Sequence, residues 1–302
     1  MKDGRDSTMS ELMQALERMS QHADVEWKSS LNARKRAEAD FHDKVRTVDR
    51  PEGPAGMAND TFEELYSNRK FYSTVAMSRE YVDKWIAEHA RGKVFLDYAC
   101  GNGQYARLAA RSGAAMSVGI DISPVSVENC RRAAAAEGLT KNCRFVQGDC
   151  ENTGLPDASV DAVICCGVLH HLDLSYVFPE LRRILRPGGA VLALEALDYN
   201  PVIKLYRNVT PNLRTEWEKA HILSLKDVRF ASRFFDVRSV KYWHLFSILT
   251  TPLRRTPIFQ KSLDVANMLD SLFLKVPPLN RLAWTFTFEL VRPQEWKPSS
   301  ST

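Results

Sequence analysis

Residues 94–106, VFLDYACGNGQYA, decide the fold: a short apolar run meets a glycine-rich turn, and a helical pattern follows directly. The run 94–99 predicts a buried strand, because it is apolar, short and bounded by a turn signal. Gly101 and Gly103 permit a tight turn and let the backbone come close to a ligand. Beyond them, apolar residues at helical spacing continue to a stop at Gly113. The stretch therefore predicts one strand, turn and helix unit of an α/β fold.

The same unit repeats along the chain. Ser123 and Pro124 place a capping hydroxyl and a proline at the start of a helix that stops near Gly138. The strands that we predict are 94–99, 116–121, 143–147, 160–166 and 190–195, with two more at 235–246 and 283–291. Alternation of strands and helices predicts a parallel, doubly wound sheet.

A polar arm precedes this main domain. Apolar residues at helical spacing predict two amphipathic helices, and they are Leu12, Leu16 and Met19 in the first and Trp27, Leu31, Ala33, Ala37 and Phe41 in the second. The stretch 49–59 carries two prolines and two glycines, which favours a linker. We therefore expect a helical arm and linker over residues 1–60 and the main domain over residues 61–302.

The bulk composition indicates a globular chain. Its 302 residues are 44% apolar, enough for a sizeable core. The 41 basic and 37 acidic residues give a formal net charge of +4, and without a long single-sign block we expect no nucleic-acid partner. No run of about 18 apolar residues would span a bilayer, and the N-terminus lacks the apolar region of a secretory signal. We expect no integral membrane segment and a cytoplasmic location.

The six cysteines are expected to be reduced thiols. None belongs to a CxxC pair, which argues against disulfides and against zinc, so we predict no metal site. Cys165 and Cys166 are adjacent in a predicted strand and point to opposite faces, which favours core packing over thiol chemistry.

Acidic residues mark the ends of the first three predicted strands. In an open α/β sheet the ligand lies beyond the carboxyl ends of the strands. Asp97 precedes the glycine turn, Asp121 ends the second strand, and Asp149 follows the third. A carboxylate in the position of Asp121 can accept hydrogen bonds from two ribose hydroxyls, and one in the position of Asp149 can accept a hydrogen bond from an adenine amino group. The three ends together suit a nucleoside with a charged amino-acid tail.

Five stretches of this chain resemble, in order, the motifs of class I S-adenosylmethionine-dependent methyltransferases. They are VFLDYACGNGQYA (94–106), VGIDIS (118–123), FVQGDCENTGLP (145–156), VICCGVLHHLDL (163–174) and LRRILRPGGAVLALE (181–195). The resemblance covers residues 94–197. It implies a Rossmann-like, doubly wound, seven-stranded and mostly parallel sheet, with a cofactor half at 93–197. Helical insertions and the last two strands, at 198–292, would wall the acceptor site and form a lid.

The same resemblance implies S-adenosylmethionine as the cofactor. Gly101 and Gly103 would line its methionine part, Asp121 would hold the ribose, and Asp149 would bind the adenine. Cys166, with the residue after it, would border the sulfonium. The full set of cofactor residues that we predict is Tyr72, Asp97, Ala99, Cys100, Gly101, Gly103, Gln104, Asp121, Ile122, Asp149, Cys150, Glu151, Cys166 and Gly167.

His170 and His171 follow the fourth strand and are the candidate catalytic residues. An imidazole with a pKa near ~6.5 accepts a proton at neutral pH. One of the two is expected to point inward as a packed, hydrogen-bonded residue, so His171 is the preferred base. Glu195, at the end of the fifth strand, either meets the substrate or caps a neighbouring element. Methyl transfer is an in-line displacement in which positioning supplies much of the acceleration, so a base is optional.

The sequence gives less information about the residues expected to wall the acceptor site than about the cofactor half. DYNPVIKLYRNVTPNLRTEWEKAHIL (198–223) resembles a bacterial branch close to the ubiquinone and menaquinone methyltransferases, although residues 216–221 depart from its acidic-His-Pro stretch. The run 253–274 is either a lid, which we favour, or an interfacial membrane helix that makes a peripheral contact.

These apolar and aromatic additions predict a small, partly hydrophobic acceptor, natural-product-like or lipid-like, methylated on a hydroxyl or amine. The alternatives are a nicotinamide-dependent reductase on a Rossmann fold and a non-catalytic methyltransferase-like scaffold. The oligomeric state stays open.

Overall fold

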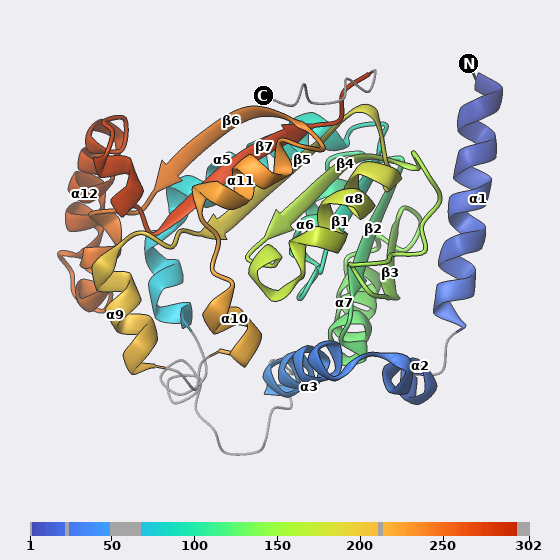
Figure 1. Cartoon of the computed structure of the whole chain (residues 1–302), viewed down its shortest axis with the longest axis horizontal. Coiled ribbons are helices and arrows are strands. Elements are labelled where there is room, and N and C mark those ends of the chain that lie inside the picture. Colours follow the sequence, from blue (N-terminus) through green and yellow to red (C-terminus); the bar gives the residue numbers. More distant parts are fainter. Residues whose placement is uncertain (1, 22–23, 49–67, 211–213, 295–302) are drawn as a thin grey trace.

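A seven-stranded, mostly parallel sheet forms the centre of the computed structural model, which describes residues 2–21, 24–48, 68–210 and 214–294 (Figure 1). The strand order is β3-β2-β1-β4-β5-β7-β6, and β7 runs in the opposite direction to the other six strands. The strands are β1 Val94–Tyr98, β2 Met116–Asp121, β3 Cys143–Gln147, β4 Val160–Cys166, β5 Leu185–Ala196, β6 Asp236–Trp243 and β7 Thr285–Val291. This arrangement confirms the predicted fold class.

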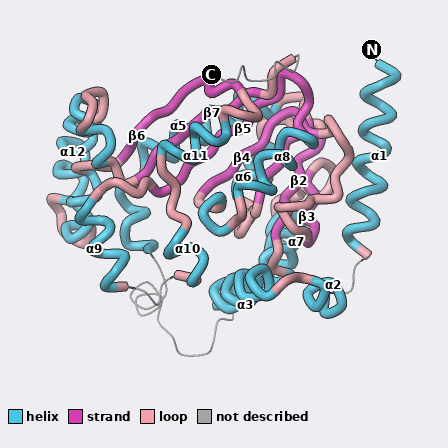
Figure 2. Tube along the Cα trace, viewed as in Figure 1, coloured by secondary structure: helices cyan, strands magenta, loops and turns pink. Residues whose placement is uncertain are grey.

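Helices cover both faces of the sheet (Figure 2). The helices of the central region are α5 Ala76–Ala90, α6 Gln104–Arg111, α7 Pro124–Ala136, α8 Leu174–Ile184 and α11 Leu225–Ala231. The apolar side chains of α8 and α11 join one face of the core, together with Leu12 and Leu16 from the N-terminal arm. Those of α5, α6 and α7 pack on the opposite face. Both sides of the parallel strands are therefore buried, as such sheets require.

The predicted strands agree closely with the observed ones. β2, β3 and β4 begin and end where the sequence predicts them. β5 begins five residues earlier than predicted, since Leu185 pairs with Val160 across an irregular register, and Arg186 is held by an ion pair of 3.0 Å to Asp161. The RPGG turn therefore lies inside the strand segment.

The described part of the N-terminal arm, residues 2–21 and 24–48, contains three helices where the sequence predicts two. They are α1 Lys2–Ser20, α2 Asp24–Ser30 and α3 Ala33–Val48. The predicted second helix is interrupted because the side chain of Asn32 accepts a hydrogen bond of 2.9 Å from the backbone N–H of Lys35, which starts α3 anew. Trp27 therefore belongs to a different helix from Phe41. The predicted linker, 49–59, lies outside the described residues.

Further elements gather at the β6 edge and below the carboxyl ends of the strands (Figure 1). They are η1 Asn68–Thr74, η2 Leu169–His171, α9 Pro201–Val209, α10 Glu216–Ala220, η4 Ser247–Leu253, α12 Phe259–Phe273 and η5 Leu279–Leu282. Over the described parts of the chain, no helix combines the length and apolar character needed to cross a membrane. α12 exposes Val265, Met268 and Leu272. Its role as a lid stays a prediction.

Candidate active site

Asp97 anchors the first turn of α6. Its Oδ2 accepts a hydrogen bond of 3.0 Å from the backbone N–H of Ala106, and the residue is 3% exposed. Burial raises the pKa of Asp97 to about 8, because a charged carboxylate is poorly solvated there. This hydrogen bond holds the first turn of α6, the helix that follows the glycine turn. The predicted contact of Asp97 with a cofactor stays a prediction.

The glycine turn depends on left-handed backbone angles at Gly101 and Gly103, with φ of 52° and 64°. A Cβ on Gly103 would lie 2.5 Å from the Phe145 ring and 2.7 Å from the Cys130 sulfur. A Cβ on Gly101 would lie 2.9 Å from the guanidinium of Arg46 in α3. The turn is therefore closed on one side by the core and on the other by a side chain of the arm.

Asp121 is held by the turn that it faces. Its Oδ2 accepts the Gly101 N–H at 2.8 Å, and its Oδ1 accepts the Ser123 N–H at 2.9 Å. Burial raises its pKa, although both backbone donors oppose the shift. Because a carboxylate has about four acceptor positions, two remain for other donors. Beside it in the sheet, the buried side-chain oxygen of Gln147 has no hydrogen-bond partner within the described structure.

The acidic pair after β3 meets two basic residues of α3. Lys35 Nζ lies 2.5 Å from Asp149 Oδ2 and 2.9 Å from Glu151 Oε2. Arg34 Nη2 lies 2.5 Å from Glu151 Oε1. The carbonyl of Cys150, between the two acids, accepts a hydrogen bond from the Tyr98 hydroxyl. α3 therefore covers the strand ends at which the adenosine was predicted.

The sequence analysis did not predict that polar residues of α3 would contact the site. Arg34, Glu38, His42 and Arg46 recur every four residues and so share one helix face. The prediction followed the apolar residues of the arm, whereas its polar face makes the contacts. The signal was the four-residue spacing, but the sequence alone does not show what that face meets.

The other predicted cofactor residues surround the same strand ends, with one exception. The Cys100 N–H donates to the Ile120 carbonyl at 2.8 Å, and Gln104 opens α6 beyond the turn. The Cys166 sulfur lies 3.2 Å from the Tyr105 hydroxyl. The remaining three are placed as follows: Ala99 has a left-handed φ of 52°, the Ile122 carbonyl accepts from Gln147 at 3.3 Å, and the Gly167 N–H donates to Leu194 at 2.8 Å.

Tyr72 is the exception. It lies in η1 and is 53% exposed. The neighbouring ring of Phe71 packs edge-on against Tyr206 of α9 and against Trp284, at centroid distances of 5.3 and 5.6 Å. This neighbourhood belongs to the β7 side of the sheet, so a contact of Tyr72 with the methionine part of a cofactor stays a prediction.

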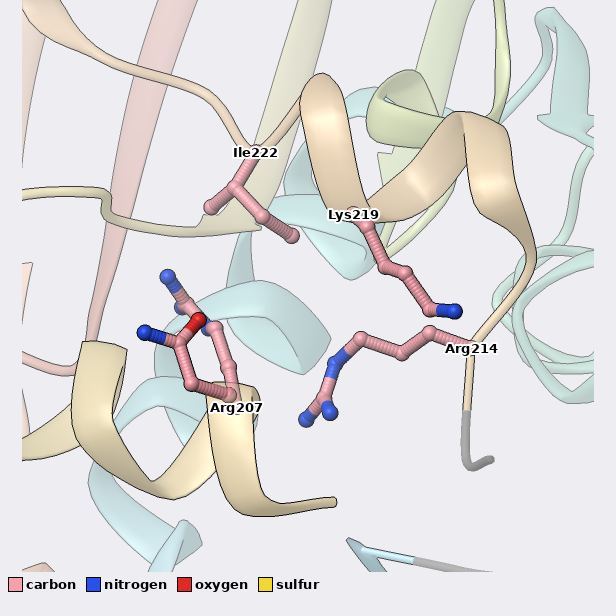
Figure 3. Close-up of a pocket in the computed structure, with 5 residues that line it drawn as sticks. Arg207, Arg214, Lys219 and Ile222 are labelled. Atoms are coloured by element: carbon pink, nitrogen blue, oxygen red, sulfur yellow. The ribbon is translucent and has the colours of Figure 1, made fainter. Parts of the chain in front are cut away.

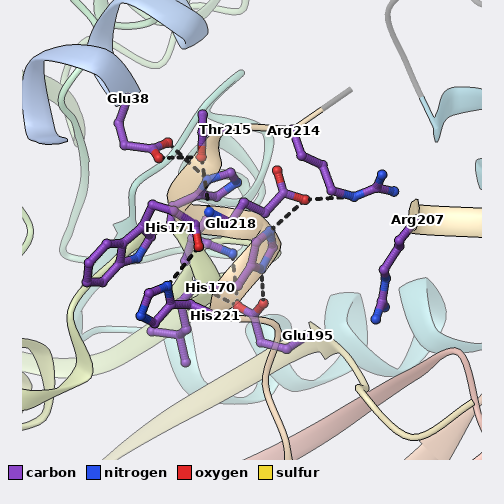
Figure 4. A network of polar contacts seen from close by, with 12 residues as sticks. Glu38, His170, His171, Glu195, Arg207, Arg214, Thr215, Glu218 and His221 are labelled. Atoms are coloured by element: carbon purple, nitrogen blue, oxygen red, sulfur yellow. Dashed lines mark hydrogen bonds and ion pairs between the residues drawn. The ribbon is translucent and has the colours of Figure 1, made fainter. Parts of the chain in front are cut away.

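Glu195 organises the segment that carries the two histidines (Figure 4). Its Oε1 accepts the N–H groups of Val168 and Leu169, both at 2.8 Å, and its Oε2 lies 2.7 Å from Nδ1 of His170. Burial opposes a charged imidazole, but the neighbouring Glu195 carboxylate outweighs it and raises the pKa of His170. Of the two predicted roles for Glu195, these contacts match the capping one.

His171 faces the arm instead. Its Nδ1 lies 3.1 Å from Glu38 Oε2, and the other oxygen of Glu38 accepts the Thr215 hydroxyl at 2.5 Å. His42 stands beside it, with ring centroids 5.0 Å apart, and burial lowers the pKa of His42 well below its usual value. Two clusters in this region have ligand atoms within 4.8 Å of one another and are able to hold a metal ion; they are Glu38, His42 and His171, and His170, His171 and Glu218. The expected lack of a metal stays a prediction.

The donor and acceptor set fits an adenosyl group. Acceptor oxygens of Asp121, Gln147 and Asp149 lie at or just after the ends of β2 and β3, where ribose hydroxyls and an adenine amino group need acceptors. The left-handed glycine turn lies beside them, and the flexible side chain of Arg46 covers it on the side of the arm. Accepting these hydrogen bonds is all that the binding of an adenosyl group requires of the three side chains.

Comparison with known proteins identifies the central region. Residues 96–193 match the family model described as a methyltransferase domain. A sterol 24-C-methyltransferase of Aspergillus fumigatus is 35% identical over 120 residues, which are 39% of this chain and 32% of that protein. The ubiquinone/menaquinone biosynthesis C-methyltransferase of Brucella anthropi is 33% identical over 150 residues, 46% of this chain and 57% of that protein. The chain thus spans about a third to about a half of these relatives.

A solved structure extends the likeness to most of the chain. The geranyl diphosphate C-methyltransferase of Streptomyces coelicolor, in complex with Mg²⁺, geranyl diphosphate and S-adenosyl-L-homocysteine, superposes with a TM-score of 0.58. The match covers 87% of this chain and 99% of that one at 14% identity, so it concerns the fold.

Proposed function

We propose that this chain, whose residues 96–193 form a methyltransferase domain, transfers the methyl group of S-adenosylmethionine to a small, partly hydrophobic molecule. The observation that carries the proposal is the row of acceptor groups at the tips of β2 and β3 beside the glycine turn. The named relatives act on sterols and quinones, and they are methyltransferases, which gives no support to the reductase alternative.

In this proposal the protein binds and orients, and the cofactor supplies an electrophilic methyl group on its sulfonium. Asp121 accepts the ribose hydroxyls through the two lone-pair positions that its backbone contacts leave. Asp149 accepts the adenine amino group while Lys35 of α3 balances its charge. The residues around Cys166 and Gly167 border the sulfonium. Holding donor and acceptor about 3 to 3.5 Å apart then supplies much of the rate acceleration.

His171 is the better candidate for a base that takes a proton from a hydroxyl or amine acceptor. His170 is engaged by Glu195 at 2.7 Å and faces Glu218 at 3.9 Å, contacts that favour its charged, proton-donating form. Among the described residues, the carboxylate within ion-pair distance of His171 is that of Glu38. We also place the enzyme in the cytoplasm, because its six cysteines are free thiols, as is usual in a reducing compartment.

Calorimetric titration with S-adenosylhomocysteine tests the proposal. We expect the full chain to bind it and not to bind NADH. Asp121→Asn keeps the volume of the side chain but exchanges one acceptor oxygen for a donor. A hydrogen bond to a charged group contributes about 1.5–3 kcal/mol, so the affinity should fall about 10-fold to 100-fold.

Asp157→Asn is the matched control. This side chain is 80% exposed and precedes β4, at the amino ends of the parallel strands and so away from the glycine turn, and its partner Arg183 keeps Glu180. Its affinity should equal that of the wild type. Unchanged affinity in a folded Asp121→Asn variant would refute the pocket assignment. Labelled cofactor offered with sterol, quinone and prenyl acceptors then tests the substrate class, and label found only on protein or RNA would contradict it.

A further inference from the structure

A cavity lined by positive charge opens between α9 and α10 (Figure 3). Its volume is about 310 Å³, and its lining residues are Arg207, Asn208, Arg214, Lys219 and Ile222. Three of the five carry a positive charge and none carries a negative one. A cavity of this size lies at the small end of the range for ligand sites. We call it the arginine cavity.

Arg207 has weak hydrogen bonds for a buried guanidinium. Its side chain is 11% exposed, and within the described structure its hydrogen bonds are one of 3.4 Å to Asp198 and one of 3.5 Å to the Leu197 carbonyl. A guanidinium has five N–H donors, and buried donors without good partners cost free energy. Burial lowers the pKa of Arg207 to about 10, and the Asp198 carboxylate compensates only in part. The acidic side chain beside Arg207 therefore does not fully balance the positive charge of its guanidinium.

The other two cations of the cavity, Arg214 and Lys219, each have an acidic partner. Arg214 is 5% exposed, and its partner Glu218, 3.2 Å away, also lies 3.9 Å from His170. Lys219 pairs at 2.5 Å with Glu216, whose side chain is 91% exposed. An exposed pair of this kind contributes little and is easily exchanged for another anion. Lys219 is therefore able to exchange Glu216 for an anionic ligand, whereas Arg207 and Arg214 keep Asp198 and Glu218 and offer the ligand their remaining N–H donors.

The arginine cavity is connected to the reaction centre through side chains (Figure 4). Arg214 contacts Glu218, Glu218 faces His170, and His170 contacts Glu195 at the end of β5. Arg207 and Arg214 lie at the outer end of this series. The cavity therefore lies near the end of β5, on the side of the sheet at which the proposed methyl donor lies.

We propose that the arginine cavity binds an oxyanion of the methyl acceptor, a carboxylate or a phosphate, through Arg207, Arg214 and Lys219. This rests on the proposed function, and it narrows the acceptor to a hydrophobic molecule with an acidic end. Planar guanidinium groups bind carboxylate and phosphate oxygens in pairs, which fixes orientation as well as affinity. The acid would hold one end of the acceptor and leave the rest to reach the methyl group.

The test uses the full chain saturated with S-adenosylhomocysteine and three probes that each contain ten carbon atoms: decyl phosphate, decanoate and 1-decanol. Calorimetry should show decyl phosphate or decanoate binding at least about 10-fold more tightly than 1-decanol. The two acids distinguish a phosphate from a carboxylate. Arg207→Gln and, separately, Lys219→Gln should weaken binding of the preferred acid by about 10-fold and leave 1-decanol unchanged. Lys219→Gln exposes no buried charge, so it keeps the test valid if Arg207→Gln unfolds.

Lys204→Gln is the matched control, because Lys204 lies on the same helix as Arg207, pairs with the same Asp198 at 2.9 Å and does not line the cavity. It should change the affinity less than twofold. Equal binding of the three probes, or equal losses in Arg207→Gln and Lys204→Gln, would overturn the proposal. Failure of S-adenosylhomocysteine to bind would instead overturn the proposed function, so the two failures are distinguishable.

Discussion

Asp97→Asn should make the protein more stable than the wild type by an amount that grows steadily from pH 5 to pH 8. The folded pKa of Asp97 is raised from 3.8 to about 8 by burial. The folded state therefore keeps a proton that the unfolded chain releases. The contribution of this carboxyl to stability is complete below pH 3.8 and is lost as the pH rises toward 8. Asparagine carries no such proton and still offers an oxygen to the Ala106 N–H.

The size of the change in unfolding free energy follows from the one proton that the folded state keeps and the unfolded state releases. One pKa unit corresponds to about 1.4 kcal/mol, so between pH 5 and pH 8 the wild type should lose up to about 4 kcal/mol relative to Asp97→Asn. Urea unfolding at four pH values in this window measures the difference, in which the other titrating groups cancel. Asp157→Asn, at an exposed site, is the control. A constant difference between wild type and Asp97→Asn would mean that Asp97 is already ionised at pH 5 in the folded protein, and the reasoning would be refuted.

Two further substitutions test the site. Gly103→Ala and Gly154→Ala both place a Cβ at a positive φ, 64° and 70°, but only the first Cβ meets neighbouring atoms. Urea unfolding should therefore show Gly103→Ala to be less stable than Gly154→Ala by about 1–3 kcal/mol, and equal losses would show that the Phe145 ring moves aside. Glu195→Gln removes the charge that raises the pKa of His170, so an NMR titration should show that pKa falling, whereas an unmoved titration would mean that Glu195 does not set it.

The sequence predicts the sheet well because each central strand is a local apolar run bounded by a turn. β2, β3 and β4 needed no information from elsewhere in the chain. The acids at the strand ends were also visible, since their position after each run is a local property. The residue that each acid contacts was not visible in the sequence. Lys35 and Asp149, for example, contact each other but are 114 positions apart. A pairing of that kind is decided by packing, and no periodicity in the sequence encodes it.

The acceptor side was harder to predict for the same reason. Arg207 and Arg214 are visible in the sequence as two basic residues seven positions apart, which is typical of a solvated helix face. Only the fold turns them toward one cavity. Tyr72 was chosen for its aromatic character as a cover for the cofactor; the structure places it in η1 with more than half of its surface exposed, and its contact with the cofactor stays a prediction.

The helix α3 links the two halves of the proposed site. At one end Lys35 and Arg34 contact the acids that follow β3. On the same helix Glu38 contacts Thr215, which caps α10, and the Arg34 guanidinium lies 4.5 Å over the ring of Trp217 in that helix. A displacement of α3 therefore removes the partners of the acids and of α10 together. We therefore expect a ligand that fixes α3 at the cofactor end also to favour the observed position of α10, which lines the arginine cavity, and such coupling would be reciprocal. The arm that looked peripheral in the sequence is the element through which cofactor and acceptor would affect each other.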